Sequence, residues 1–154
     1  MRILVVSDTH GHARALEEAI TFQPTANVVI HLGDGVREAE DMAARFPDRT
    51  FCIVRGNCDF GADVLPMREE TFAGRRLFFT HGHLYDVKYG LYRISCAARE
   101  READMVLFGH THQPLSLYDD GLYLLNPGSL GHGRQYATVD ISPAGIFPIL
   151  HTLK

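Results

Sequence analysis

Aspartate, asparagine and histidine residues, most of them beside a glycine, follow five short apolar runs of the chain. The five segments are Asp8-Thr9-His10, Gly33-Asp34, Gly56-Asn57, Thr80-His81-Gly82-His83 and Gly109-His110-Thr111-His112. Carboxylate, amide and imidazole donors without thiolate suit borderline divalent ions such as manganese, iron, nickel, cobalt and zinc. In Asp8-x-His10 and His110-x-His112, one intervening residue places both donors on the same side of an extended loop, where both can reach one ion. These segments therefore predict a metal centre.

The five segments contain more donors than a single ion needs. The seven candidate ligands are Asp8, His10, Asp34, Asn57, His81, His110 and His112. A structural zinc site, by comparison, uses four ligands. The simplest interpretation is two ions that share a bridging carboxylate. Such pairs lie roughly 3.5–4 Å apart and stabilise both the attacking and the leaving oxygen of a phosphoryl group.

The apolar runs before these segments are typical of buried strands. In the first third of the chain they alternate with helical patterns, an order that indicates right-handed parallel crossovers. The predicted elements there are a strand at 3–6, a helix at 13–22, a strand at 28–30, a helix at 36–46 and a strand at 51–54. Ligands bind at the carboxyl ends of strands in such sheets, which is where the candidate donors lie.

Hairpin patterns dominate the rest of the chain. The predicted hairpins pair 69–72 with 75–80, 115–118 with 122–125, and 136–141 with 146–152, and a helix at 90–103 precedes a strand at 105–108. Crossovers followed by hairpins predict an α/β fold with two mixed sheets packed face to face and helices outside. The 154 residues contain no internal repeat and no linker, so we expect a single domain over 1–154.

Composition and charge argue against several classes of protein. The formal net charge is −4, both signs are scattered, and we therefore expect no stable binding to nucleic acid. No apolar stretch approaches the roughly 20 residues of a membrane span. Three cysteines without a secretory leader indicate reduced thiols and a cytoplasmic location.

Taken in order, the candidate segments resemble the calcineurin-like metallophosphoesterase superfamily. They are most similar to its small bacterial and archaeal phosphodiesterases of the YfcE type, relatives of a retromer subunit with the same fold. Gly56-Asn57-Cys58-Asp59, Thr80-His81-Gly82-His83 and Asn126-Pro127-Gly128-Ser129 look like that subfamily. The resemblance extends from Met1 to about Ile149 and implies a four-layer α/β/β/α sandwich of two mixed sheets.

The resemblance also implies an activity and a set of ligands. Asp8, His10, Asp34 and His112 would hold the first ion, and Asp34, Asn57, His81 and His110 the second. The implied activity is hydrolysis of a small phosphate ester, most directly a phosphodiester, by a hydroxide bridging the two ions. Manganese is the expected ion, with nickel, iron, cobalt and zinc as alternatives. The residues expected to take part in catalysis are Asp34, Asn57, Asp59 and His83. Of these, Asp59 would orient the Asn57 loop and His83 would hydrogen-bond near the site.

Cys58 departs from the wider superfamily, many of whose members have histidine directly after the asparagine. That histidine is thought to protonate the leaving group. A thiol with a pKa near 8.5 is a poor general acid. We therefore expect modest turnover and a preference for esters with good leaving groups, such as aryl phosphodiesters.

Alternatives remain open for the function and for several residues. The chain could be a non-catalytic interaction scaffold on the same fold, a phosphomonoesterase or a hydrolase of other esters. Homo-oligomers could form through exposed strands or the tyrosine-rich segment 85–92. The expectations for individual residues are a packing or capping role for His31, ordinary surface positions for His12, His132 and His151, and an exposed charge for Arg134.

Overall fold

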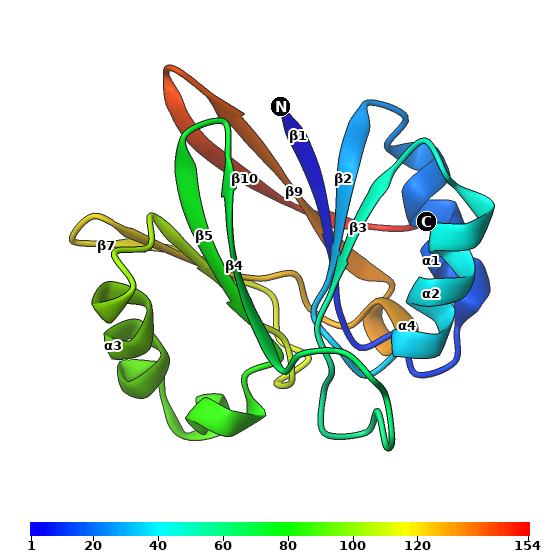
Figure 1. The fold of residues 1–154 in the computed structure, drawn as a ribbon, viewed down its shortest axis with the longest axis horizontal. Coiled ribbons are helices and arrows are strands. Elements are labelled where there is room, and N and C mark those ends of the chain that lie inside the picture. Colours follow the sequence, from blue (N-terminus) through cyan, green and yellow to red (C-terminus); the bar gives the residue numbers. More distant parts are fainter.

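Two five-stranded mixed sheets pack face to face in the computed structural model, which describes residues 1–154 (Figure 1). In spatial order, the first sheet contains β10 (Gly145–Thr152), β9 (Gln135–Ser142), β1 (Arg2–Val6), β2 (Ala26–His31) and β3 (Thr50–Ile53). The second contains β4 (Met67–Phe72), β5 (Arg75–Thr80), β6 (Met105–Leu107), β8 (Leu122–Asn126) and β7 (Leu115–Asp119).

Helices cover the outer surfaces of both sheets. Helices α1 (Ala13–Phe22) and α2 (Val36–Arg45) lie on the first sheet, and α3 (Tyr92–Glu100) lies on the second (Figure 1). The predicted α/β/β/α sandwich is therefore confirmed. None of the helices is both long enough and apolar enough to cross a membrane.

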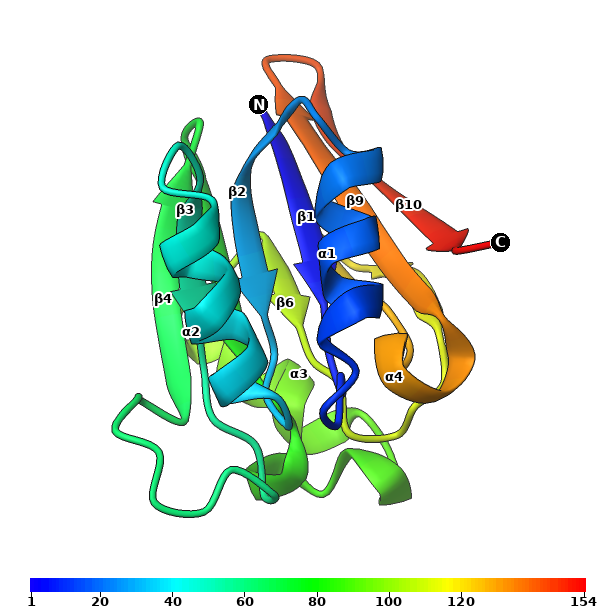
Figure 2. The same cartoon turned by 90° about the vertical axis from the view of Figure 1, so that its right-hand side faces the viewer.

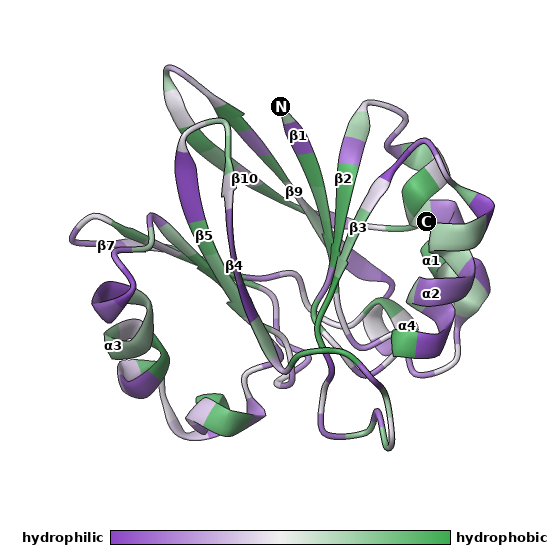
Figure 3. Ribbon diagram, in the orientation of Figure 1, coloured by the Kyte–Doolittle hydropathy of each residue, from purple (hydrophilic) through white to green (hydrophobic).

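Strand β1 shows why the central strands have no polar face. Its alternate residues Ile3 and Val5 join the hydrophobic cluster between the sheets, while Leu4 and Val6 pack in the cluster beneath α1 and α2. Because both faces are covered, the strand is apolar from Ile3 to Val6. Figure 3 shows this as a continuous hydrophobic stretch along most of β1, in contrast to the hydrophilic positions on α2 and α3.

The predicted pairings are confirmed. Strand β1 is parallel to β2 and β2 to β3, and the three predicted hairpins are the antiparallel pairs β4–β5, β7–β8 and β9–β10. In Figure 2, β1, β2 and β6 run toward the same end of the sandwich. The loops that follow these strands therefore gather at one edge, as the sequence predicts.

The chain departs from the predicted elements mainly around α3 and after β8. The predicted helix 90–103 is shorter, because Gly90 has a φ of 142° and Glu102 has a φ of 54°, conformations that do not continue an α-helix. Two short 3₁₀ helices, η1 (His83–Tyr85) and η2 (Val87–Tyr89), precede it. Helix α4 (Leu130–Gly133), a single turn after β8, is absent from the predicted elements.

Candidate metal centre

Backbone hydrogen bonds join the loops that carry the candidate ligands. The amides of Asp8 and His10 donate to the carbonyls of Gly33 and Asp34, each over 3.0 Å. The amide of Gly109, in the loop after β6, donates over 2.9 Å to the loop after β5. These bonds fix the loops after β1 and β2 to each other in the first sheet, and the loops after β5 and β6 to each other in the second.

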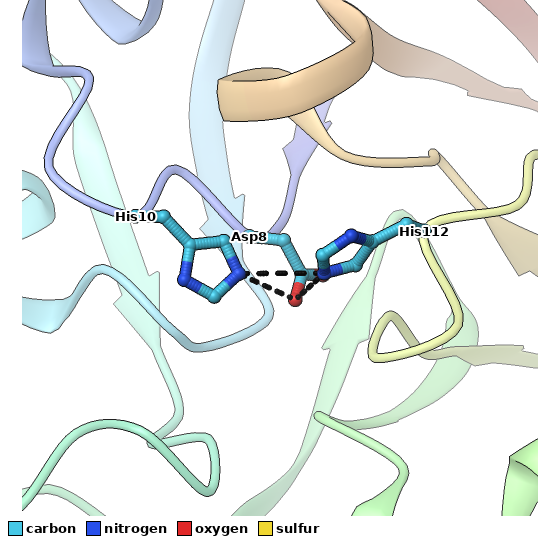
Figure 4. Close-up of side chains that lie close together, drawn as sticks. All are labelled: Asp8, His10 and His112. Atoms are coloured by element: carbon cyan, nitrogen blue, oxygen red, sulfur yellow. Dashed lines mark hydrogen bonds and ion pairs between the residues drawn. The ribbon is translucent and has the colours of Figure 1, made fainter.

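The side chains of the first group of candidate ligands, Asp8, His10 and His112, point toward one another (Figure 4). His112 Nε2 is 3.1 Å from Asp8 Oδ1, and His10 Nε2 is 3.5 Å from the same oxygen. The two Nε2 atoms are 3.3 Å apart. We call His10 and His112, whose side chains are 24% and 37% exposed, the outer pair.

The second group is buried. His81 Nε2 lies 3.3 Å from Asp34 Oδ2 and 3.9 Å from Asp8 Oδ1. The side chains of His81 and Asp8 are 0% exposed and that of Asp34 is 3% exposed. On the other side of the His81 ring, Nδ1 is 2.8 Å from the carbonyl oxygen of Leu32. A hydrogen bond from Nδ1 to this oxygen fixes the ring so that Nε2 faces the carboxylates. We call Asp8, Asp34 and His81 the inner group.

His110 adjoins the inner group. Its Nδ1 lies 3.2 Å from His81 Nε2, and its amide donates to Asp8 Oδ2 over 3.2 Å. Burial and the neighbouring His81 lower the pKa of the His110 imidazole to about 4. His110 is therefore neutral at physiological pH, which is the form that binds metal.

The electrostatics of the inner group favour a cation between its members. Burial opposes the ionisation of Asp34, but hydrogen bonds to His81 and Cys58 outweigh it and hold the pKa of Asp34 well below its usual range. Burial also disfavours the charged form of His81, yet the hydrogen bond to Asp34 and the charge of Asp8 raise the pKa of His81. The carboxylates thus favour the protonated form of His81 in the free protein.

The donor set fits divalent metal ions. The ligand atoms of Asp8, His10 and His112 lie within 4.8 Å of one another, and so do those of Asp8, Asp34 and His81. Both groups combine carboxylate oxygen with imidazole nitrogen, the combination that suits borderline divalent ions. A bound ion would replace the proton on His81 as the positive charge between the carboxylates.

Backbone strain concentrates at the candidate ligands. Five of them have positive φ: Asp8 (55°), His10 (44°), Asp34 (57°), His110 (70°) and His112 (60°). Positive φ is uncommon outside glycine and clusters at functional sites, where the surrounding structure enforces it. Here the interloop hydrogen bonds provide that enforcement.

Two glycines allow the loops to approach this closely. A Cβ atom at Gly56 would overlap Oδ1 of Asp34, and one at Gly109 would overlap Oγ of Ser7 and lie 2.7 Å from Oδ2 of Asp8. The glycines beside the candidate ligands in the sequence therefore have a steric reason.

Asp59 lies next to the site but contacts backbone groups only. Its carboxylate accepts hydrogen bonds from four amides, those of Asp34 (2.7 Å), Gly35 (2.9 Å), Val36 (3.0 Å) and Gly56 (2.7 Å). It thereby ties the loop after β3 to the start of α2 and to the amide of a candidate ligand. These contacts hold Asp34 more directly than they hold Asn57.

The remaining predicted site residues lie at different distances from the inner group. The His83 ring centroid is 5.4 Å from that of His81, and its Nδ1 is buried without a hydrogen-bond partner. Asn57 is exposed, and its Nδ2 contacts Cys58 Sγ at 3.5 Å. Ligation by the Asn57 side chain stays a prediction.

Cys58 lies closer to the ligands than the sequence indicated. Its sulfur is within 4.8 Å of ligand atoms of His10 and Asp34, and its amide donates to Asp34 Oδ1 over 2.8 Å. Partial burial and the charge of Asp34 raise the pKa of the Cys58 thiol. The thiol is therefore neutral at physiological pH.

His132, expected to be an ordinary surface residue, lies against the outer pair. Its ring stacks on His112 with centroids 5.2 Å apart and lies 5.0 Å from that of His10. It comes from α4, which Ser129 anchors by donating from Oγ to the carbonyl of Asp8 over 2.9 Å and accepting from the amide of His132. Nothing in the local sequence signals this contact, because it depends on where α4 docks.

The expectations for other residues are largely met. His31 is fully buried, with Nε2 3.1 Å from Thr9 Oγ1 and Nδ1 accepting from the amide of Gly33. The side-chain amide of Asn126 donates to the carbonyl of Gly109 over 3.1 Å and so supports the loop after β6. Arg134 pairs with Glu18 over 2.7 Å and does not point into the site.

Comparison with known proteins identifies the family. The model of the calcineurin-like phosphoesterase superfamily domain matches residues 1–143. The chain belongs to this superfamily. It is 34% identical over 131 residues to the probable metallophosphoesterase YsnB of Bacillus subtilis, a match covering 84% of this chain and 75% of the relative.

Two further similarities are with a curated phosphodiesterase and with a solved structure. The chain is 28% identical to phosphodiesterase YfcE of Escherichia coli, over 91% of this chain and 88% of that protein. The crystal structure of Vps29 from Entamoeba histolytica in complex with zinc superposes with a TM-score of 0.78 over 98% of each chain, at 18% identity. This last similarity shows a shared fold only.

Proposed function

We propose that the chain is a metal-dependent phosphodiesterase whose two divalent ions share Asp34. The position of Asp34 carries this proposal. Its Oδ2 lies 3.3 Å from Nε2 of His81 in the inner group and 3.9 Å from Nε2 of His10 in the outer pair. A carboxylate between two sets of nitrogen donors is suited to bridge two ions.

Each ion would have its own ligands besides Asp34. Asp8, His10 and His112 would complete one site, and Asn57, His81 and His110 the other. When bound, the ions supply positive charge beside the phosphoryl group. They also lower the pKa of bound water toward neutrality. The chain itself holds the ligands in place: Leu32 fixes the ring of His81, and Asp59 fixes the backbone of Asp34.

The neutral thiol of Cys58 supports a preference for good leaving groups. The Cys58 sulfur, in the loop after β3, lies within 4.8 Å of ligand atoms of both His10 and Asp34. Its raised pKa makes it a weaker proton donor than a histidine would be. Aryl phosphodiesters, whose leaving groups need little protonation, are therefore the expected substrates.

Several finer points stay predictions. Manganese is the expected ion, and nickel, iron, cobalt and zinc also suit the donors. The substrate is expected to be a small phosphate ester, the location cytoplasmic, and homo-oligomers remain an open alternative. His83 is expected to act near the inner group, where its unpartnered Nδ1 lies.

The test is hydrolysis of bis(p-nitrophenyl) phosphate by metal-stripped protein titrated with manganese. We expect activity that requires metal and disappears in Asp34→Ala. Asp41→Ala, which removes an exposed aspartate from α2, is the matched control and should retain full activity. Absence of metal-dependent hydrolysis in the folded wild-type protein would contradict the proposal. Parallel rates on p-nitrophenyl phosphate and p-nitrophenyl acetate separate a diesterase from a monoesterase or another esterase.

A non-catalytic scaffold is the second candidate. Exposed apolar side chains on the edge strands β7 and β10, such as Tyr118 (59%) and Phe147 (49%), favour it. The complete set of carboxylate and imidazole donors argues against it. A folded protein that retains no metal and hydrolyses none of the tested esters would favour the scaffold.

A further inference from the structure

A cavity of about 440 Å³ extends from the candidate metal centre to the surface. Residues 35–38 and Glu40 at the start of α2 form one wall, and residues 58–62 form another. The candidate ligands His10 and Asp34 line the same cavity. A phosphoryl group held at the ions would therefore have this space directly beside it.

Phe60 gives the cavity an apolar surface. Its side chain is 91% exposed, an unfavourable state for a large apolar ring in the free protein. The loop that carries it is anchored on both sides, by the four amide contacts of Asp59 and by the bond from the Arg55 amide to the carbonyl of Leu65. The exposed ring is thus held beside the site rather than on a free loop. Aromatic faces in such positions bind other rings by stacking.

The charges around the cavity select against anions. Its lining contains Glu38, Glu40 and Asp59 but only one cationic residue, Arg37. Asp59 is occupied by backbone amides, and Glu38 accepts a hydrogen bond from Thr9 over 2.8 Å. The excess of acidic residues disfavours a second phosphate or a carboxylate in this space.

We propose that the cavity binds an uncharged, ring-bearing ester substituent of the substrate, with the ring stacked on Phe60. The substrate class is then a phosphodiester carrying a nucleoside or an aryl group. The volume of about 440 Å³ lies within the usual range of small-molecule sites. This inference rests on the proposed function, because the metal centre must hold the phosphoryl group at the end of the cavity.

The test measures binding without turnover. Benzylphosphonate and methylphosphonate, whose P–C bonds resist hydrolysis, are titrated calorimetrically into manganese-loaded protein. We expect the wild-type protein to bind benzylphosphonate about tenfold more tightly than methylphosphonate. Phe60→Ala should reduce this ratio to about twofold or less. Phe22→Ala, which removes a phenylalanine that is 64% exposed on α1, should leave the ratio unchanged.

A third ligand tests the charge argument. 4-Carboxybenzylphosphonate should bind more weakly than benzylphosphonate, because its carboxylate faces the acidic lining. Tighter binding of this ligand would overturn the proposed selection for uncharged groups.

The outcomes separate this inference from the proposed function. Hydrolysis of bis(p-nitrophenyl) phosphate with no effect of Phe60→Ala on the ratio would overturn the cavity assignment and leave the function standing. A Phe60-dependent ratio without hydrolysis would support the binding site and contradict the enzyme. Neither hydrolysis nor phosphonate binding would overturn both.

Discussion

The inner group and the outer pair of candidate ligands differ in how the protein holds them. His81 is completely buried, and its ring is fixed by the carbonyl of Leu32 on one side and by Asp34 on the other. His10 and His112 are partly exposed, and their rings pack against His132, itself exposed on a one-turn helix. The inner ligands therefore belong to the core of the fold, whereas the outer ligands lie on its surface.

This difference indicates a division of roles between the two ions. Buried ligands with fixed partners are preorganised, so binding an ion there requires little rearrangement. Partly exposed ligands have more freedom, and their ion is more accessible to exchange. We therefore expect the ion held by His81 to bind more tightly than the ion held by His112, and to be coupled more strongly to folding.

The largest expected effect comes from paired substitutions in the two regions. In metal-free protein, His81→Ala should lower the free energy of unfolding by about 3 kcal/mol, because it leaves buried carboxylates without their cationic partner. His112→Ala should remain within about 1 kcal/mol of the wild-type value, since its side chain is 37% exposed. Urea denaturation of both variants at neutral pH measures the difference. Equal decreases in the free energy of unfolding of the two variants would contradict the proposed difference between the inner group and the outer pair.

Asp59 tests whether the preorganisation of the inner group comes from the backbone. Asp59→Asn retains one acceptor oxygen where four amides now donate to a carboxylate, so the start of α2 and the amide of Asp34 lose support. We expect manganese affinity to fall roughly 10–100-fold, as it does when supporting partners of ligands are lost. Asp63→Asn, an exposed residue in the same loop, is the control. An unchanged affinity would assign the preorganisation to side chains alone.

Cys58 tests the chemistry between the two regions. Cys58→His places a proton donor beside His10 and Asp34, and we expect about a tenfold or larger gain with alkyl phosphodiesters. Hydrolysis of bis(p-nitrophenyl) phosphate should change little, because its leaving group does not require protonation. Rates for both substrates across a pH series measure the effect. No gain with the alkyl ester would remove support for the missing-acid explanation.

The smallest effect is expected at His132, which supports only the outer pair. His132→Ala should weaken binding of the more weakly held ion about threefold, because the rings of His10 and His112 lose a packing partner. His132→Phe keeps a ring in this position and should restore the affinity. If phenylalanine failed to restore it, the contribution of His132 would lie in its ring nitrogens rather than in packing.

Strand-end motifs made much of the fold and site predictable. The alternation of covered positions in β1 and the donors after each apolar run depend on local sequence, and the structure brings Asp8, Asp34 and His81 together as that pattern predicts. The turn glycines at 121 and 145, both at positive φ, likewise fall within predicted hairpins. Local rules succeed here because each element's pattern agrees with its place in the fold.

Contacts made between distant segments could not be predicted in the same way. Helix α4 has two glycines in four residues, a weak helical sequence, and it forms because the amides of Leu130 and Gly131 donate to the carbonyls of Ser7 and Asp8. Its position against the outer pair, and hence that of His132, follows from this docking alone. Three of the four amide contacts of Asp59, those with Asp34, Gly35 and Val36, depend in the same way on segments 23 to 25 residues apart along the chain.

The most direct test of the central claim is the number and coupling of bound manganese ions. Electron paramagnetic resonance of metal-stripped protein titrated with manganese should show two spin-coupled ions per chain, since Asp34 lies between both sets of donors. His112→Ala should retain the ion held by His81 and lose the coupling. A single ion per chain, or two uncoupled ions that persist unchanged in Asp34→Ala, would contradict the shared-carboxylate centre.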